Sequence, residues 1–237
     1  MTTEKTMLQI VQDACTDVGQ PRPSVVASST DETPRRMLRI LNKAGTQLMR
    51  EFEWPKLRTV ETFNATAAEE QITPSSTSFA RLSPQSTIWH VGTQRQVIGP
   101  VSMEKWNQLH IFPISTAQFY WTMIGDRFNI YPIPAVSDQF RYSFVYQKWA
   151  SNAAETTSTL EFLADDDQHY LDDELLTLEL VWRWKHAIGI DYAEDMASSS
   201  RYKEMLYAGM RNADTLNLSD PWQGKLPEGY WPGYITA

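Results

Sequence analysis

The chain has 237 residues, of which 42% are hydrophobic and 21% are charged, the composition of an ordinary globular protein. Its formal net charge of -8 argues against a broad basic face that grips nucleic acid. The single cysteine, Cys15, excludes an intramolecular disulfide, and its place on an apolar helix face favours a buried thiol over a nucleophile. No apolar run is long enough for a membrane span and the N-terminus does not read as a signal peptide, so we expect a protein made in a reducing cytoplasm.

Two helices are predicted at the N-terminal end. Residues 4–18 place apolar side chains at helical spacing. A second helix follows a loop, with Thr33 as its expected N-cap and Pro34 in its first turn, positions that these residue types favour. This helix is expected to end at Trp54, because the residue before a proline, here Pro55, is disfavoured in helix geometry.

The pattern then changes to short runs rich in aromatic and β-branched residues, which are typical of strands. These runs occupy residues 57–63, 87–91, 95–99, 118–124, 127–132 and 140–149. The dipeptide Gly125-Asp126 between two of them predicts a tight hairpin, and Ser102 to His110 predicts a short helix. This part of the chain is therefore predicted to be an antiparallel β module.

The negative charge is concentrated after the β module. Residues 151–191 contain ten acidic and two basic side chains, whereas residues 1–150 carry a small positive excess. The first part of this region, residues 151–171, is interpreted as a polar, acidic link between the β module and the helices that follow.

Two helices are predicted next, one from Asp172 to Asp191 and one over 192–214, the second with Met196, Leu206 and Met210 on one side. The last residues contain three prolines and three glycines, which exclude a helix. The predicted fold class is α+β: a helical bundle formed by the N- and C-terminal segments, with an inserted antiparallel β module and an extended C-terminal arm. The expected boundaries are 1–56 and 151–213 for the helical domain, 57–150 for the β module and 214–237 for the arm.

No catalytic or phosphate-binding motif is present, so we expect neither an enzyme nor a cofactor. The acidic run that contains Asp165, Asp166 and Asp167 is a candidate cation site from its composition. A calcium loop needs alternating oxygen ligands and a central glycine, and this run has neither. We therefore interpret Asp172 and Asp173 as helix-capping residues, the rest of the run as solvated, and predict no metal.

The helix from Asp172 is apolar over most of its circumference. Trp182 and Trp184 are two residues apart, so they point to nearly opposite sides. The narrow polar stripe holds Glu179 and Arg183, which can form an ion pair at i, i+4. Two interpretations stay open: the helix is central in its own bundle, or a neighbouring subunit covers one of its sides.

Three stretches carry a resemblance to a known family. They are "LNKAGTQLMREFEWPKL" (41–57), "RFNIYPIPAVSDQFRYSFVYQKW" (127–149) and "DDELLTLELVWRWKHAIGIDYAEDMASSSRYKEML" (172–206). With the order of the predicted elements, they resemble the head-to-tail adaptor proteins of short-tailed bacteriophages, the tail tubular protein A-like family. The resemblance implies a virion structural protein that forms a ring, typically a dodecamer. It also implies that the ring joins the portal to the tail nozzle, and that DNA passes through it without specific binding.

The resemblance gives roles to several residues. Aromatic side chains expected at the subunit or portal interface are Trp182, Trp184, Trp222, Tyr230, Trp231 and Tyr234. Carboxylates repel phosphates, so the acidic run supplies candidates for the channel wall, the alternative being a solvated outer linker. These candidates are Asp165, Asp166, Asp167, Asp172 and Asp173. Other functions kept open are another tail-tube or stopper component and a carbohydrate-binding β module.

Overall fold

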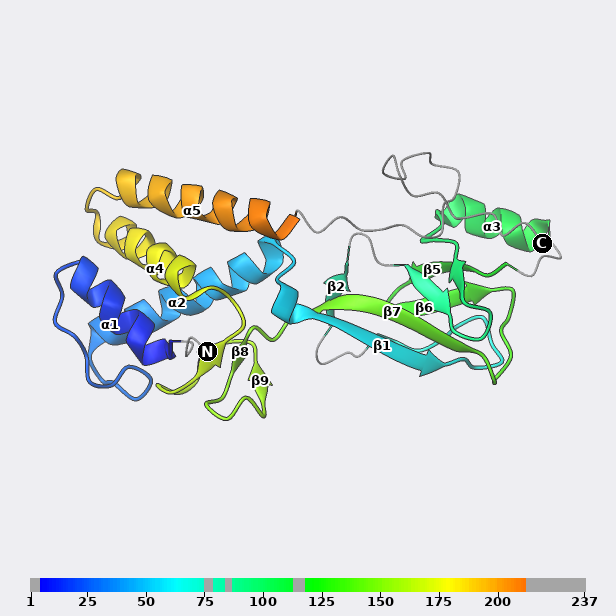
Figure 1. Cartoon of the computed structure of the whole chain (residues 1–237), viewed down its shortest axis with the longest axis horizontal. Helices are drawn as coiled ribbons and strands as arrows, with labels where there is room; N and C mark the ends of the chain where they lie inside the picture. The colour runs from blue at the N-terminus through cyan, green and yellow to red at the C-terminus, as the bar shows by residue number, and fades with distance from the viewer. Residues whose placement is uncertain (1–4, 75–78, 84–86, 113–117, 212–237) are drawn as a thin grey trace, which may run out of the picture.

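The computed structural model describes residues 5–74, 79–83, 87–112 and 118–211, which form an α+β fold. Two lobes lie end to end (Figure 1). One lobe contains four long helices and a small sheet. The other contains the longer strands and the short helix α3 (Met103–Ile111). The helices and antiparallel sheets confirm the predicted fold class, and the segment predicted as a C-terminal arm lies outside the described residues.

The first two helices are α1 (Met7–Asp17) and α2 (Glu32–Glu51). A capping box starts α1, in which the Thr6 hydroxyl accepts a hydrogen bond from the Gln9 amide and the Gln9 side chain accepts one from the Thr6 amide. The predicted start of α2 was wrong, because Asp31 is the N-cap and Thr33 already lies in the first turn. Pro34 is tolerated there because the first amides of a helix have no partner within the helix.

The other two long helices are α4 (Asp173–Ile188) and α5 (Ala193–Arg211). The Asp172 side chain caps α4 by accepting a hydrogen bond from the Leu175 amide, as the sequence predicts. Gly189 ends the helix at φ 77°, a left-handed conformation that glycine adopts without strain. Helix α4 packs against α1, α2 and α5, so neighbours within the same subunit cover most of its apolar circumference.

The β lobe is built around the pair β1 (Arg58–Asn64) and β7 (Gln139–Tyr146), which run antiparallel over their whole length. Strands β3 (Ile88–His90) and β4 (Arg95–Val97) continue the sheet in the order β1-β7-β3-β4. Strands β5 (Tyr120–Ile124) and β6 (Arg127–Tyr131) form the predicted hairpin around Gly125.

Four short strands were not predicted. Strand β2 (Phe79–Leu82) pairs with β7. The segment interpreted as a polar link, 151–171, begins within β8 (Ala150–Ser151) and contains β9 (Ser158–Thr159) and β10 (Gln168–His169), and these three strands form a sheet. Two-residue strands are too short to show a period of two in the sequence.

Each lobe has its own apolar core, and the helical core extends toward the β lobe. Trp54 and Leu57 enter it just before β1, and Val145 and Trp149 enter it at and after the end of β7. Trp149 is fully buried and packs against Gly45 of α2. The core of the helical lobe therefore includes residues from both sides of the predicted domain boundaries. The boundaries themselves stay a prediction.

Candidate functional site

Within the described ranges, no group of three or more His, Cys, Asp or Glu side chains could hold a metal ion. The same part of the chain contains no helix long and apolar enough to cross a membrane. Cys15 is buried beside Met37, and burial raises the pKa of its thiol, which keeps it protonated at neutral pH.

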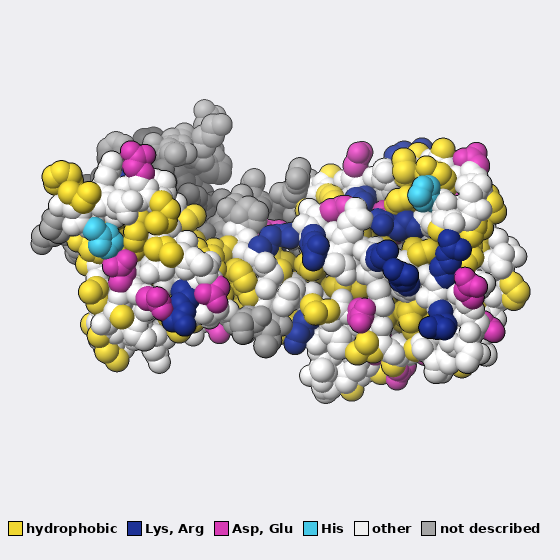
Figure 2. Space-filling model, turned by 180° about the vertical axis from the view of Figure 1, so that it is seen from behind, with side chains coloured by type: hydrophobic (Ala, Val, Ile, Leu, Met, Phe, Trp, Pro, Cys, Tyr) yellow, Lys and Arg dark blue, Asp and Glu magenta, His cyan; other side chains and the backbone are white. Residues whose placement is uncertain are grey.

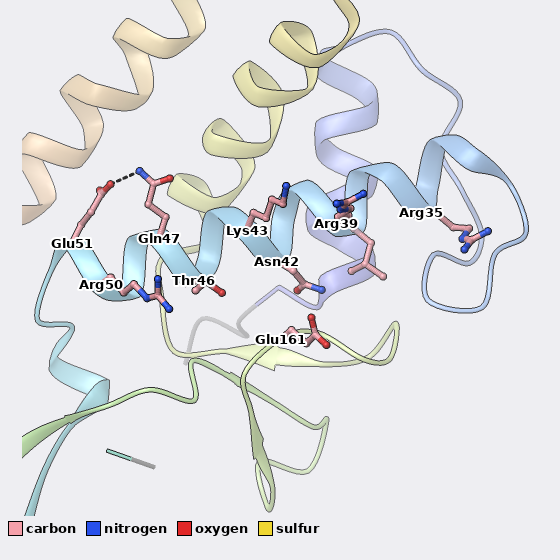
Figure 3. Close-up of a pocket in the computed structure, with 10 residues that line it drawn as sticks. Arg35, Arg39, Asn42, Lys43, Thr46, Gln47, Arg50, Glu51 and Glu161 are labelled. Atoms are coloured by element: carbon pink, nitrogen blue, oxygen red, sulfur yellow. Dashed lines mark hydrogen bonds between the residues drawn. The ribbon is translucent and has the colours of Figure 1, made fainter. Parts of the chain in front are cut away.

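A groove of about 790 Å³ runs along the outward face of α2. In Figure 3, α2 crosses the front of the helical lobe, and Glu161 faces it from the segment between β9 and β10. Asn42 holds this segment in place, because its side chain accepts a hydrogen bond from the Phe162 amide at 2.9 Å and donates one to the Phe162 carbonyl at 3.3 Å. One wall of the groove is therefore a helix and the other is an ordered loop.

The groove is predominantly basic. Arg35, Arg39, Lys43 and Arg50 line it, and all four are exposed. The first three are spaced four residues apart, which places them on one side of the helix at intervals of ~6 Å. None of the four forms an ion pair with an acidic group in the described ranges. We call these four residues the α2 basic stripe, and Figure 2 shows basic side chains gathered on the helical lobe at this face.

The α2 basic stripe was missed in the sequence because the chain as a whole is acidic. The signal was present, since Arg35, Arg39 and Lys43 recur every fourth residue of a predicted helix. The sequence could not show that nearby acidic side chains bind other residues of the same subunit and therefore do not pair with the α2 basic stripe. Glu51 at the end of the groove accepts hydrogen bonds from Gln47 and from Lys203, at 2.6 and 2.9 Å.

The two tryptophans predicted at an interface lie in different environments. Trp184 is 5% exposed in the helical core, with the Arg36 guanidinium 5.6 Å from its ring centre. Trp182 is half-buried, with the Arg183 guanidinium 4.7 Å from its ring centre and the Tyr192 ring at 6.3 Å. Intrasubunit packing accounts for Trp184, and Trp182 keeps a partly open face. Their part in an interface stays a prediction.

Glu179 was expected on a narrow polar stripe of α4, but its side chain is 2% exposed and is buried against α5. It forms the predicted ion pair with Arg183, at 2.8 Å, and also accepts a hydrogen bond from Ser199 at 2.8 Å. Lys203 lies 3.4 Å away. Burial by itself would raise the pKa of Glu179, but these partners outweigh it and hold the pKa below its usual value. Helix α5 is therefore attached to α4 partly through a buried ion-pair network.

The inward face of α5 also differs from the prediction. Leu206 and Met210 pack against the helical core as expected, whereas Met196 is 43% exposed. The buried positions are taken instead by Ser199 and by the network around Glu179. Because a polar residue replaces an apolar one on this face, spacing of apolar residues alone could not identify it.

Three of the acidic residues predicted for a channel wall have partners inside the subunit. Asp165 accepts hydrogen bonds from the Val26 and Ala27 amides at 2.9 and 2.8 Å. Asp167 is 5% exposed and accepts two amides of its own turn. Asp172 caps α4. These carboxylates fix loops and a helix end.

The remaining two differ from each other. Asp166 is exposed. Asp173 accepts a hydrogen bond from the Lys5 amide at 3.1 Å, and its Oδ1 lies 2.9 Å from His169 Nε2. Burial opposes ionisation of Asp173, but His169 and Lys5 outweigh it, so its pKa lies below the usual value. Of the five candidates, Asp166 has the most accessible carboxylate, and the channel role stays a prediction.

The other interface candidates, Trp222, Tyr230, Trp231 and Tyr234, lie outside the described residues.

Comparison with known proteins gives one match. A model of the SU10 adaptor protein family matches residues 5–225, which is nearly the whole chain. No curated protein matches the sequence.

Proposed function

Because the chain belongs to the SU10 adaptor protein family and is therefore a structural component of a bacteriophage virion, we propose that it forms the ring that joins the portal to the tail. The family match over residues 5–225 carries this proposal. It agrees with the resemblance to head-to-tail adaptors, whose three stretches all lie within the matched residues. In this proposal the ring is a dodecamer, its partners are the portal and the tail nozzle, and the protein acts without catalysis.

The shape and the surface of the subunit support a ring component. The two lobes lie end to end, so one subunit has two well-separated ends with different surfaces (Figure 1). The helical lobe would meet the portal, and the β lobe would meet the nozzle or a neighbouring subunit. The half-buried Trp182 and the α2 basic stripe are the described features best suited to contact another chain, since tryptophan and arginine are enriched at interfaces.

The DNA channel is the second part of the proposal. We assign part of the acidic segment to its wall, with Asp166 as the residue whose carboxylate is free to face DNA. Carboxylates give no counterion-release affinity for phosphates, so DNA can slide past them. Asp165, Asp167, Asp172 and Asp173 would then shape this surface through the loops that they hold.

The C-terminal residues 214–237 are proposed to act as an arm in assembly. Trp222, Tyr230, Trp231 and Tyr234 would anchor it on the portal or on an adjacent subunit, since each aromatic side chain buries a large area for little loss of rotamer entropy. The alternative is that the arm covers its own β lobe.

A carbohydrate-binding function is not favoured. Sugar rings stack on exposed aromatic side chains, whereas most aromatic side chains of the β lobe, such as Trp121, Phe128 and Tyr142, are at most 1% exposed and form its core. Trp89 and Phe112 are exposed, at 38% and 71%, but the family match favours the adaptor. The test is native mass spectrometry of the purified protein, alone and with the purified portal. Rings that form with the portal would support the adaptor function. A protein that stays monomeric with the portal would refute it, and binding to a glycan array would then favour the carbohydrate-binding alternative.

A further inference from the structure

The α2 basic stripe suits a negatively charged partner, and the groove around it favours a protein over DNA. Glu161 forms part of the wall, so the groove is not uniformly basic as a surface for a phosphate backbone would be. Leu38 also lines the groove, and Leu160 and Leu163, which flank Glu161, are 53% and 62% exposed. A surface that combines unpaired arginines with exposed leucines is typical of a protein interface.

A matching surface occurs on the same lobe, on the outward face of α5. Glu194 and Glu204 are exposed there and form no ion pair with any basic group of the described residues. Met205 lies close to Glu194 around this helix and is 61% exposed, so the face also carries apolar area without a partner in the subunit. We propose that the outward face of α5 in one subunit docks into the α2 groove of the next subunit, an inference that rests on the ring proposed above.

The charges on the two helices have matching spacing. Arg39 and Arg50 are eleven residues apart, ~16 Å along a helix, and Glu194 and Glu204 are ten residues apart, ~15 Å. With the helices parallel, Glu194 lies opposite Arg39 when Glu204 lies opposite Arg50. Both glutamates are then paired with an arginine.

The same register accounts for Arg201, the basic residue that lies between Glu194 and Glu204 on this face of α5. Arg201 is exposed, and its guanidinium bonds back to the Ala197 carbonyl and the Ser198 hydroxyl. It falls beside Thr46 and Gln47, the uncharged interval of the α2 basic stripe. With the helices antiparallel, Arg201 would instead lie near Lys43, and the like charges would repel. The charge pattern therefore selects the parallel arrangement.

The directions of α2 and α5 within one subunit are compatible with a parallel contact between neighbouring subunits of a ring. Helices α2 and α5 both run toward the β lobe (Figure 1). Their C-terminal ends lie together, as shown by the 2.9 Å ion pair of Glu51 with Lys203 and the stacking of Phe52 on Tyr207 at 4.1 Å. Helix α4 packs against both, so their outward faces point in different directions. Rotation about an axis along the helices keeps neighbours parallel and brings the α5 face of one subunit to the α2 face of the next, a heterologous contact that closes into a ring.

Charge reversal tests the register. Arg50→Glu alone and Glu204→Arg alone should each lower the yield of portal-bound rings by about tenfold or more, because each creates a like-charge contact. The double variant Arg50→Glu/Glu204→Arg should restore ring formation. Arg50→Glu/Glu194→Arg should not, since residue 194 lies at the other end of the paired helices. Rings are counted by native mass spectrometry, and circular dichroism verifies the fold of each variant.

Lys105→Glu on α3 is the matched control, with the same change of charge on an exposed residue of the β lobe, and it should leave ring formation unchanged. If the wild-type protein forms no ring with the portal, the proposed function fails. If wild-type rings form and Arg50→Glu rings form equally well, only the present inference fails. Rescue by Glu194→Arg instead of Glu204→Arg would overturn the parallel register. An Arg50→Glu variant that keeps its rings but loses DNA binding in a fluorescence anisotropy assay would assign the stripe to DNA.

Discussion

Replacing Gly45 by alanine should destabilise the protein although alanine is the better helix former. Gly45 lies within α2, and a Cβ atom built there comes within 3.0 Å of three atoms of the Trp149 indole. Trp149 is fully buried, and its ring packs against Phe162 at 4.9 Å, so the indole cannot move aside freely. The close contact between α2 and Trp149 therefore depends on the missing side chain.

The magnitude follows from two opposing effects. Overpacking a core costs about 1–3 kcal/mol, and three close atoms at a rigid ring favour the upper end of that range. Glycine to alanine in a helix gains up to about 1 kcal/mol. The free energy of unfolding should therefore fall by about 2 kcal/mol, which lowers the melting temperature by roughly 4–8 °C in a chain of this size.

Gly209→Ala on α5 is the matched control, because nothing lies within 4 Å of the added Cβ atom. It should raise the free energy of unfolding by about 0.5–1 kcal/mol. Thermal and urea unfolding followed by circular dichroism measure both variants. If Gly45→Ala is as stable as Gly209→Ala, the proposed contact between α2 and Trp149 is wrong.

Three further predictions concern the ion-pair network, the tryptophans and the C-terminal arm. The folded-state pKa of Glu179 lies below its usual value of 4.5, so the ionised Glu179 stabilises the fold above that pH, and this stabilisation is lost as the pH falls through the folded-state pKa. Glu179→Gln should therefore lower the free energy of unfolding at neutral pH. The variant should also flatten the acid side of a stability–pH profile measured by urea unfolding. Trp184→Ala should cost about 3–5 kcal/mol in urea unfolding, as expected for a buried tryptophan, whereas Trp182→Ala should cost less and mainly reduce portal-bound rings in native mass spectrometry; equal stability losses would contradict the different burial of the two rings. Deletion of 215–237 should keep the melting temperature of the subunit and abolish portal binding, and a truncated protein that unfolds would show instead that the arm covers its own subunit.

The longer elements could be predicted from the sequence because local signals agree with the tertiary structure. The hairpin of β5 and β6 was found through Gly125-Asp126, and α4 through its apolar spacing and its cap at Asp172. The start of α2 was placed too late because Thr33 and Pro34 are typical of a helix start, while Asp31 takes the N-cap position without a side-chain hydrogen bond. Local preferences at helix ends differ by fractions of a kcal/mol, and tertiary contacts decide between them.

The surfaces were harder to predict than the elements. Burial of Glu179 depends on Ser199 and Lys203, which reach it from another helix. Likewise, Asp165 looked solvated in the sequence, but it binds two amides that are more than 130 residues away along the chain. Which charges stay unpaired is a property of the folded chain as a whole, so the α2 basic stripe emerged only from the structure.

The antiparallel pair of β1 and β7 has a mechanical consequence. It begins at Arg58 and Val145, beside the helical core, and ends at Asn64 and Gln139, where the neighbouring Phe63 and Phe140 belong to the core of the β lobe. The chain therefore passes twice between the lobes at this end of the pair, and Trp54, Leu57, Val145 and Trp149 anchor both passages in the helical core. Two anchored connections restrict rotation of one lobe about the other more than a single connection would.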